Sequence, residues 1–213
     1  MIVVVALVTG IMRIALKLPA THQQWLPMGA ERAVSMGSGR GLLIVYTGGG
    51  KGKTTAALGM ALRAVGYGHR VLILQFIKGS WHYGELESIK RLAPEVELVQ
   101  GGEGFVGIID DTKEFSEHEL AAQQALALAR TKIATDAYDL VILDEINYAV
   151  QLNLIPLDAV QQLIADRPRR LDLVLTGNHA DPSIIEIADL VTEMREIKHP
   201  YQQGISAKKG IDF

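Results

Sequence analysis

With 213 residues, of which 48% are hydrophobic and 21% charged, the chain can bury one good core and is not a disordered protein. Its formal net charge of −3 gives no indication of a nucleic-acid partner or an anionic membrane surface. The absence of cysteine excludes disulfides, thiolate nucleophiles and cysteine-ligated metals, and it fits a reducing, cytoplasmic compartment.

Residues 1–40 differ in character from the rest of the chain. The apolar run MIVVVALVTGIMRIALKL is interrupted by Arg13, so it falls short of the roughly 20 residues that a membrane-spanning helix needs. Its positive charges follow the apolar run, whereas a secretory signal carries them before it. We therefore expect no membrane role, an N-terminal extension over 1–40 that is poorly ordered or precedes the true start, and one domain over 41–213.

A glycine-rich loop follows the first predicted strand. Residues 42–47 form a short apolar run that is typical of a buried strand, and TGGGKGKTT comes directly after it. The usual phosphate-binding signature is G-x-x-x-x-G-K-[ST], but Thr47 stands where its first glycine belongs. Glycines let backbone N–H groups turn toward an anion, and the helix that follows adds its N-terminus. The pattern predicts a nucleotide phosphate site in a loop that is one residue short.

Strands and helices alternate along the remainder of the chain. Helices are predicted after the glycine loop up to Gly66, over 85–92, from a capping box of Ser116 and Glu119, and from Pro156. Further strands are predicted at 71–76, 96–100, 138–145, 171–178 and 190–198. Continuous apolar strands of this kind indicate a mainly parallel sheet with helices on both faces and all carboxyl ends at one edge. That edge should gather the glycine loop, 75–78, 101–105, 144–145 and 176–179.

Several motifs together resemble one known family. The segments TGGGKGKTTAALGMALRAVGYGHRV, LILQFIKGSWHYGE, GGEGF, YDLVILDEIN and ADLVTEMREIKHPYQQGISAKKGIDF, in this order, resemble the P-loop ATP:corrinoid adenosyltransferases from about Gly41 to Phe213. The resemblance implies an α/β, P-loop NTPase (RecA-like) three-layer fold with a mainly parallel central sheet flanked by helices.

The resemblance also implies a reaction. In this family ATP is understood to bind in a flipped sense, so that its ribose C5′ faces the cobalt(I) of a corrinoid and intact triphosphate leaves. Lys51 and Lys53 would neutralise the charge on the leaving triphosphate, and Thr54, Glu145 and Asp144 would hold Mg²⁺ (or Mn²⁺). The residues expected to bind ATP are Gly48, Gly49, Gly50, Lys51, Gly52, Lys53, Thr54 and Thr55.

The corrinoid contacts match the family only in part. Phe105 fits an aromatic position of the family after the third strand, whereas Gly107 stands where tryptophan is common. Trp81 and Tyr83 are further aromatic candidates for contact with the corrinoid. Asn178 stands where the family often has arginine, so an arginine contact is expected to be lost or replaced.

Two other functions remain open at this point. The chain could be a module that binds adenosylcobalamin and delivers it to a client enzyme, or a conventional phosphotransferase or NTPase with a variant loop. The resemblance further implies a homodimer and a reducing flavoprotein partner, because cobalt must be reduced to cobalt(I).

Overall fold

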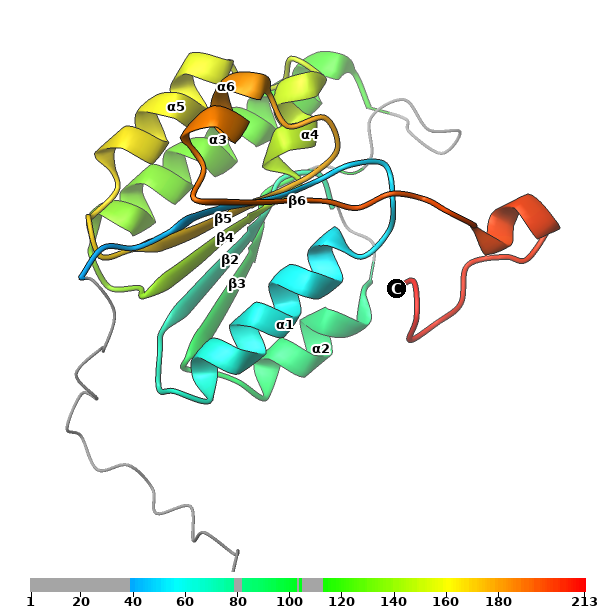
Figure 1. Ribbon diagram of the computed structural model, residues 1–213, viewed down its shortest axis with the longest axis horizontal. Helices are drawn as coiled ribbons and strands as arrows, with labels where there is room; N and C mark the ends of the chain where they lie inside the picture. Colours follow the sequence, from blue (N-terminus) through cyan, green and yellow to red (C-terminus); the bar gives the residue numbers. More distant parts are fainter. Residues whose placement is uncertain (1–38, 79–81, 103, 105–112) are drawn as a thin grey trace, which may run out of the picture. The chain divides into compact units, whose positions relative to one another are not determined.

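The computed structural model describes residues 39–78, 82–102, 104 and 113–213. Its centre is a six-stranded sheet in the order β3-β2-β4-β5-β1-β6, and every neighbouring pair of strands is parallel (Figure 1). This sheet confirms the α/β fold class. The strands are β1 (Leu43–Thr47), β2 (Val71–Gln75), β3 (Val96–Gln100), β4 (Leu140–Asp144), β5 (Asp172–Thr176) and β6 (Leu190–Glu193).

Helices cover both faces of the sheet. In Figure 1, α1 and α2 lie below the sheet, whereas α3, α4, α5 and α6 lie above it. Helix α1 follows the glycine loop and ends at Gly66, as the sequence predicts. The helices are α1 (Lys53–Val65), α2 (Gly84–Lys90), α3 (Phe115–Ala134), α4 (Ile146–Gln151), α5 (Leu157–Asp166) and α6 (Pro182–Ile187), and a short 3-10 helix spans Pro200–Gln203.

The strand sequences are continuously apolar because the inner strands are buried on both faces. All five residues of β2 and of β4 are buried. Successive residues of a strand point to opposite faces, so Leu43 and Val45 join the core under α3–α6 while Ile44 joins the core against α1. Because the strands are parallel, their carboxyl ends lie along a single edge, where the glycine loop lies.

Some predicted boundaries are wrong. Helix α3 starts at Phe115, and its capping box is formed by Glu114 and Glu117 instead of Ser116 and Glu119. The last strand ends at Glu193, well before the predicted residue 198. Helices α4 and α6 were not expected, because each has only six residues and shows little periodicity.

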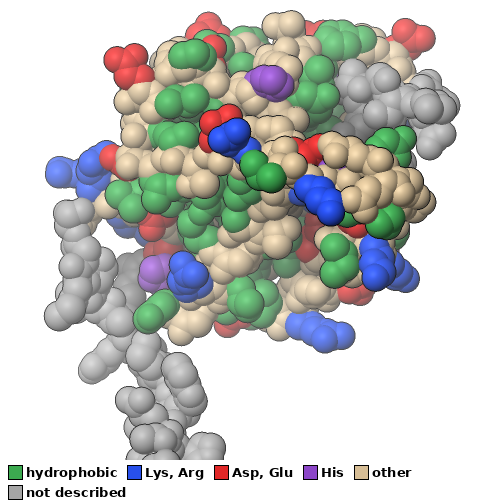
Figure 2. Space-filling view, turned by 45° about the vertical axis from the view of Figure 1, so that its right-hand side comes forward, with side chains coloured by type: hydrophobic (Ala, Val, Ile, Leu, Met, Phe, Trp, Pro, Cys, Tyr) green, Lys and Arg blue, Asp and Glu red, His purple; other side chains and the backbone are tan. Residues whose placement is uncertain are grey.

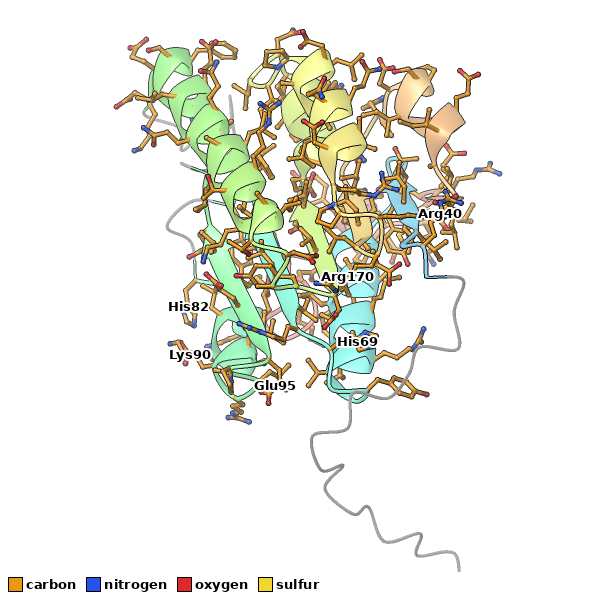
Figure 3. All side chains as sticks on the ribbon, turned by 90° about the vertical axis from the view of Figure 1, so that its left-hand side faces the viewer. Arg40, His69, His82, Lys90, Glu95 and Arg170 are labelled. Atoms are coloured by element: carbon orange, nitrogen blue, oxygen red, sulfur yellow. The ribbon has the colours of Figure 1, made fainter. Side chains whose placement is uncertain are left out.

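The edge opposite the glycine loop is held by ion pairs. Figure 3 looks onto the amino ends of the strands, where Arg40 and Arg170 are labelled. Arg40 pairs with Asp189, and Arg170 pairs with Asp136 at 2.9 Å and Asp139 at 2.8 Å. The first pair ties the segment before β1 to the one before β6, and the other two tie the segment before β5 to the one before β4.

The surface combines charged and apolar side chains. With the right-hand side of Figure 1 turned forward, hydrophobic side chains lie exposed among acidic and basic ones (Figure 2). All four residues of the edge strand β6 are exposed. In the part of the chain that the structure describes, no helix is both long and apolar enough to cross a bilayer. The predicted domain boundary at residue 40 stays a prediction, because residues 1–38 lie outside the described part.

Candidate functional site

The glycine loop, residues 48–52, connects β1 to α1 at the carboxyl edge. Gly48 and Gly52 have φ angles of 92° and 109°, in the left-handed region that favours glycine. Thr47 is the last residue of β1, is paired with Glu193, and accepts a 3.0 Å hydrogen bond from the Ala180 N–H through its hydroxyl. Thr47 therefore belongs to the sheet, and the loop begins at Gly48.

The segment after β6 supports the loop from one side. The Gly50 N–H donates to the Met194 carbonyl oxygen at 2.7 Å. A Cβ atom on Gly50 would lie 2.7 Å from the Arg195 carbonyl carbon, and one on Gly48 would lie 2.5 Å from the Met194 oxygen. Only glycine allows this close approach of the two backbones. Gly49 has nothing within 4 Å of its own Cβ position, so it faces open space.

Lys53 lies inside the curve of the loop. Its side chain is buried, and its Nζ donates to the carbonyl oxygens of Gly48 at 2.7 Å and Gly50 at 2.9 Å. Burial lowers the pKa of the Lys53 ammonium, while the nearby carboxyl groups of Glu145 and Asp144 act to raise it. The ammonium is thus held where an anion in the loop would meet it.

Asp144 connects three strand ends to the first turn of α1. One carboxylate oxygen, Oδ1, accepts hydrogen bonds from the Thr54 hydroxyl at 2.9 Å and the Thr176 hydroxyl at 2.7 Å. The other, Oδ2, accepts from the Gln75 amide at 3.3 Å. Asp144 is only 1% exposed, so these donors replace the water that a carboxylate would otherwise bind. The structure brings the predicted pair of Thr54 and Asp144 into direct contact.

Glu145 has an unusual backbone and an unusual pKa. Its φ angle is 65°, and its N–H donates to the Thr176 hydroxyl at 2.9 Å. Burial, together with the adjacent Asp144, raises the pKa of the Glu145 carboxyl to about 7, while Lys53 and Lys78 act to lower it. A carboxyl group that is buried next to another carboxylate gains from a bound cation, so Glu145 suits a cation site.

The oxygen donors at this edge fit a magnesium ion. Thr54, Asp144 and Glu145 offer hydroxyl and carboxylate oxygens, which hard divalent cations prefer. The Gln75 side-chain oxygen is also buried and has no hydrogen-bond donor in the part of the chain described. Within that same part no three His, Asp or Glu side chains converge as a metal cluster. A magnesium ion that is bound together with nucleotide phosphates needs fewer protein ligands than such a cluster supplies.

The structure adds Lys78, to which the sequence assigned no role. Its Nζ lies 2.8 Å from Glu85 Oε1, 3.7 Å from Asp144 Oδ2 and 4.6 Å from the centre of the Tyr83 ring. Lys78 is buried, so this cation is fixed between α2 and the end of β4. The sequence predicts that residues 75–78 reach this edge, and Lys78 is the one charged residue among them. The sequence could therefore have identified Lys78 as a candidate.

The remaining loop residues are more exposed. Lys51 points out of the loop and forms an ion pair with Asp212, near the C-terminus of the chain. Thr55 is exposed on the first turn of α1. Both lie near enough in sequence to the loop to contact a bound phosphate, but the structure alone gives neither of them that contact.

The corrinoid candidates are described only in part. Phe105, Trp81 and Gly107 lie outside the described residues. The Tyr83 ring is 7% exposed and lies under the Lys78 ammonium, so little of it is available to a corrinoid in this conformation. Asn178 is half-buried after β5. Asn147 in α4 was missed: it is 1% exposed, and its amide has no partner within the described part of the chain.

A hollow of about 810 Å³ lies beside the residues that follow β5. It is formed by the turn between α4 and α5, the turn before α6 and one residue of α3. His179 and Asn153, two of its lining residues, have φ angles of 54° and 58°. No residue of the glycine loop lines this hollow, so it is separate from the loop.

Comparison with known proteins agrees with this geometry. A family model described as ATP:corrinoid adenosyltransferase BtuR/CobO/CobP matches residues 39–213. A corrinoid adenosyltransferase of Escherichia coli (strain K12) is 38% identical over 174 residues, which cover 82% of this chain and 86% of that protein. One from Pseudomonas aeruginosa is 40% identical over 174 residues, or 82% and 84% of the two chains. The corrinoid adenosyltransferase CobA of Salmonella typhimurium is 36% identical, covering 82% and 86%.

Proposed function

Because the chain belongs to the ATP:corrinoid adenosyltransferase family, we propose that it transfers the 5′-deoxyadenosyl group of ATP to the cobalt(I) of a corrinoid and releases triphosphate. The observation that carries this proposal is the glycine loop, with Lys53 inside it and Thr54 bonded to Asp144, within a match that spans residues 39–213. The reaction belongs to cobalamin metabolism.

The bonding changes in this reaction are simple. The electron pair of cobalt(I) forms the bond to C5′, the C5′–O bond breaks, and the oxygen leaves with its pair as part of the triphosphate. The nucleophile gives up no proton, so the reaction needs no general base. What the protein must supply is alignment of C5′ with cobalt and stabilisation of the negative charge that grows on the leaving group.

Residues of the loop have a proposed part in that stabilisation. Within residues 48–52 the backbone N–H groups other than that of Gly50, which already donates to the Met194 carbonyl oxygen, cradle the triphosphate. Lys53 exchanges its loop carbonyls for phosphate oxygens, and Lys51 adds a second positive charge. Thr55 contributes a hydroxyl from the first turn of α1.

Magnesium, or manganese, is proposed to be held by Thr54 and Glu145, with Asp144 in support. When bound, the ion supplies positive charge against the triphosphate. Asp144 orients the Thr54 hydroxyl through their 2.9 Å contact, and Glu145 brings a second carboxyl group to the same edge. Burial, and after it the adjacent Asp144, raises the pKa of Glu145, and a cation at that position would offset both effects, which supports this proposal.

Further parts of the proposal rest on family resemblance. Phe105, Trp81 and Tyr83 are proposed to contact the corrinoid, and a reducing flavoprotein is proposed to supply cobalt(I). The enzyme is proposed to be a cytoplasmic homodimer, with the catalytic domain spanning 41–213.

One assay tests the proposed reaction against the other two functions. The full chain is incubated with ATP, Mg²⁺ and chemically reduced cobalamin, the cobalamin spectrum is followed, and the phosphate products are separated. Adenosylcobalamin together with inorganic triphosphate is the expected result. Tight cobalamin binding without turnover would indicate a delivery module, and ADP with phosphate would indicate an NTPase; either result would overturn the proposal.

A further inference from the structure

Lys78 has a position that the proposed reaction does not yet use. It follows β2, and its ammonium lies between two carboxylates, 2.8 Å from Glu85 and 3.7 Å from Asp144. Its side chain is 11% exposed, and the Tyr83 ring lies against the ammonium on a further side. Glu85 belongs to the first turns of α2, so the position of the cation is set by a helix instead of by a flexible loop.

Lys78 and Thr54 contact opposite oxygens of the same carboxylate. Thr54 donates to Asp144 Oδ1, whereas Lys78 and the Gln75 amide face Oδ2. Because the positive charge of Lys78 lies at Oδ2 of Asp144, the other oxygen, Oδ1, stays oriented toward the Thr54 hydroxyl at the start of α1. The same charge acts on Glu145, together with that of Lys53. Lys78 is therefore part of the electrostatic environment of the glycine loop, although it lies outside the loop itself.

The geometry points to Lys78 as a positioning residue for the triphosphate site: it orients Asp144 toward Thr54 and supplies fixed positive charge that favours the triphosphate anion. This inference rests on the proposed function only in taking a triphosphate as the ligand. Buried charges of this kind interact more strongly than exposed ones, because little water screens them. Glu85 holds the ammonium in place and offsets part of its charge.

The fixed positive charge of Lys78 predicts a specific dependence of triphosphate binding on metal. Among the described residues, Lys53 and Lys78 are the buried lysines at this edge, so without magnesium the loss of the Lys78 charge weakens triphosphate binding. With magnesium held by Thr54 and Glu145, beside Asp144, the metal would supply positive charge at the same edge and cover most of that loss. A residue that merely supports the fold would have the same effect with and without the metal.

The experiment titrates inorganic triphosphate into the full chain by calorimetry, without corrinoid, once in EDTA and once in saturating Mg²⁺. Lys78→Met is expected to weaken binding about tenfold in EDTA, or about 1.4 kcal/mol, and less than about threefold in Mg²⁺. Lys78→Arg keeps the charge and should stay within about threefold of wild type in both buffers. Lys90→Met is the matched control, because Lys90 lies at the other end of α2, is 69% exposed and pairs with Glu87.

Equal loss in both buffers, or no loss in EDTA, would overturn the inference. Wild-type protein that does not bind triphosphate in EDTA would overturn it too. If Lys78→Met does not fold, Lys78→Gln replaces it, since the amide can still donate to Glu85. Failure of the proposed function is separately visible: wild-type protein would form no adenosylcobalamin, whatever the metal dependence of Lys78→Met.

Discussion

Lys53 combines burial with hydrogen bonds that a ligand can replace. Its ammonium donates to the Gly48 and Gly50 carbonyl oxygens, and burial lowers its pKa. A lysine kept in this way by the fold alone would contribute little net stability, because the hydrogen bonds offset the cost of burying the charge. Its position is better explained by a bound anion than by stability.

Lys53→Ala is therefore expected to abolish activity with little effect on folding. We expect kcat/KM for adenosyl transfer to fall at least about 100-fold, since the charge opposes that of the leaving triphosphate. The thermal unfolding midpoint should move by no more than about 4 °C. Both quantities are measured on the same preparation, by the cobalamin spectrum and by circular dichroism. Transfer within threefold of the wild-type rate would contradict the assigned role of Lys53.

The glycines of the loop provide a second contrast at the scale of single residues. Gly50→Ala puts a methyl group 2.7 Å from the Arg195 carbonyl carbon, so the loop must move, at a cost of about 1–3 kcal/mol. Gly49→Ala meets nothing within 4 Å. We expect the first variant to unfold at a lower temperature and to bind triphosphate at least about tenfold more weakly, while the second stays close to wild type. Similar behaviour of the two variants would show that the tight contact with the segment after β6 does not shape the loop.

Strands and helices differ in how accurately the sequence predicts their boundaries. The inner strands were predicted within one or two residues, because burial on both faces leaves a continuous apolar run between turns. Helices α4 and α6 were not, because six residues are too few for a helical period to be visible. The start of α3 was misplaced because Glu114 and Glu117 can form the same reciprocal cap as a serine and a glutamate.

A charged cluster joins β3 to α3 and predicts a pH dependence of stability. Glu97 on β3 accepts hydrogen bonds from Lys132 on α3, at 2.6 Å, and from Tyr138. These contacts lower the pKa of Glu97, and the pKa of Lys132 is raised chiefly by its hydrogen bond to Glu97. A lowered carboxyl pKa stabilises the fold above the unfolded-state pKa, and the effect is lost as the pH falls through the folded-state pKa. A raised lysine pKa stabilises the fold at every pH below the ordinary pKa of lysine. This stabilisation is lost as the pH rises through the folded-state pKa.

Glu97→Gln should accordingly lower the free energy of unfolding by roughly 0.5 kcal/mol at pH 7, a small value because solvent screens the cluster. The difference from wild type should shrink as the pH falls below 4.5, the ordinary pKa of a glutamate. Urea unfolding at pH 7 and at pH 3 measures it. Glu95→Gln, in the turn directly before β3, serves as the control and should change little at either pH. If Glu97→Gln lowers the free energy of unfolding by the same amount at pH 3 as at pH 7, the ionised Glu97 carboxylate is not the source of the stabilisation.

The site depends on contacts between distant segments that the sequence could not reveal. The sequence placed the glycine loop, 75–78 and 144–145 at one edge, because parallel strands end together. It could not show that Lys78 faces Asp144, that Met194 supports Gly50, or that the end of the chain reaches Lys51. Each of these contacts joins segments that are far apart in the chain, and their side-chain directions depend on packing instead of on local pattern.

The pair of Lys51 and Asp212 joins the glycine loop to the C-terminal segment across 161 residues. In the proposed reaction Lys51 must leave Asp212 to meet the triphosphate, so the carboxylate competes with the ligand for the same cation. The pair lowers the pKa of Asp212, which is therefore ionised at neutral pH. Exposed ion pairs are weak and are screened by salt, so the competition is mild and should fade as the ionic strength rises.

Asp212→Asn removes this competitor and keeps the shape of the side chain. We expect the KM for ATP to fall about threefold at low salt, with kcat within twofold, and the difference to disappear near 1 M salt, where charges are screened within about 3 Å. Glu87→Gln breaks a comparable exposed pair with Lys90 on α2 and should leave the KM for ATP unchanged at any salt concentration. A rise in KM for Asp212→Asn would reverse the interpretation, since it would mean that Asp212 holds Lys51 in its binding position. The salt series separates the two cases, because a competing charge loses its effect with screening whereas a lost support for the loop does not.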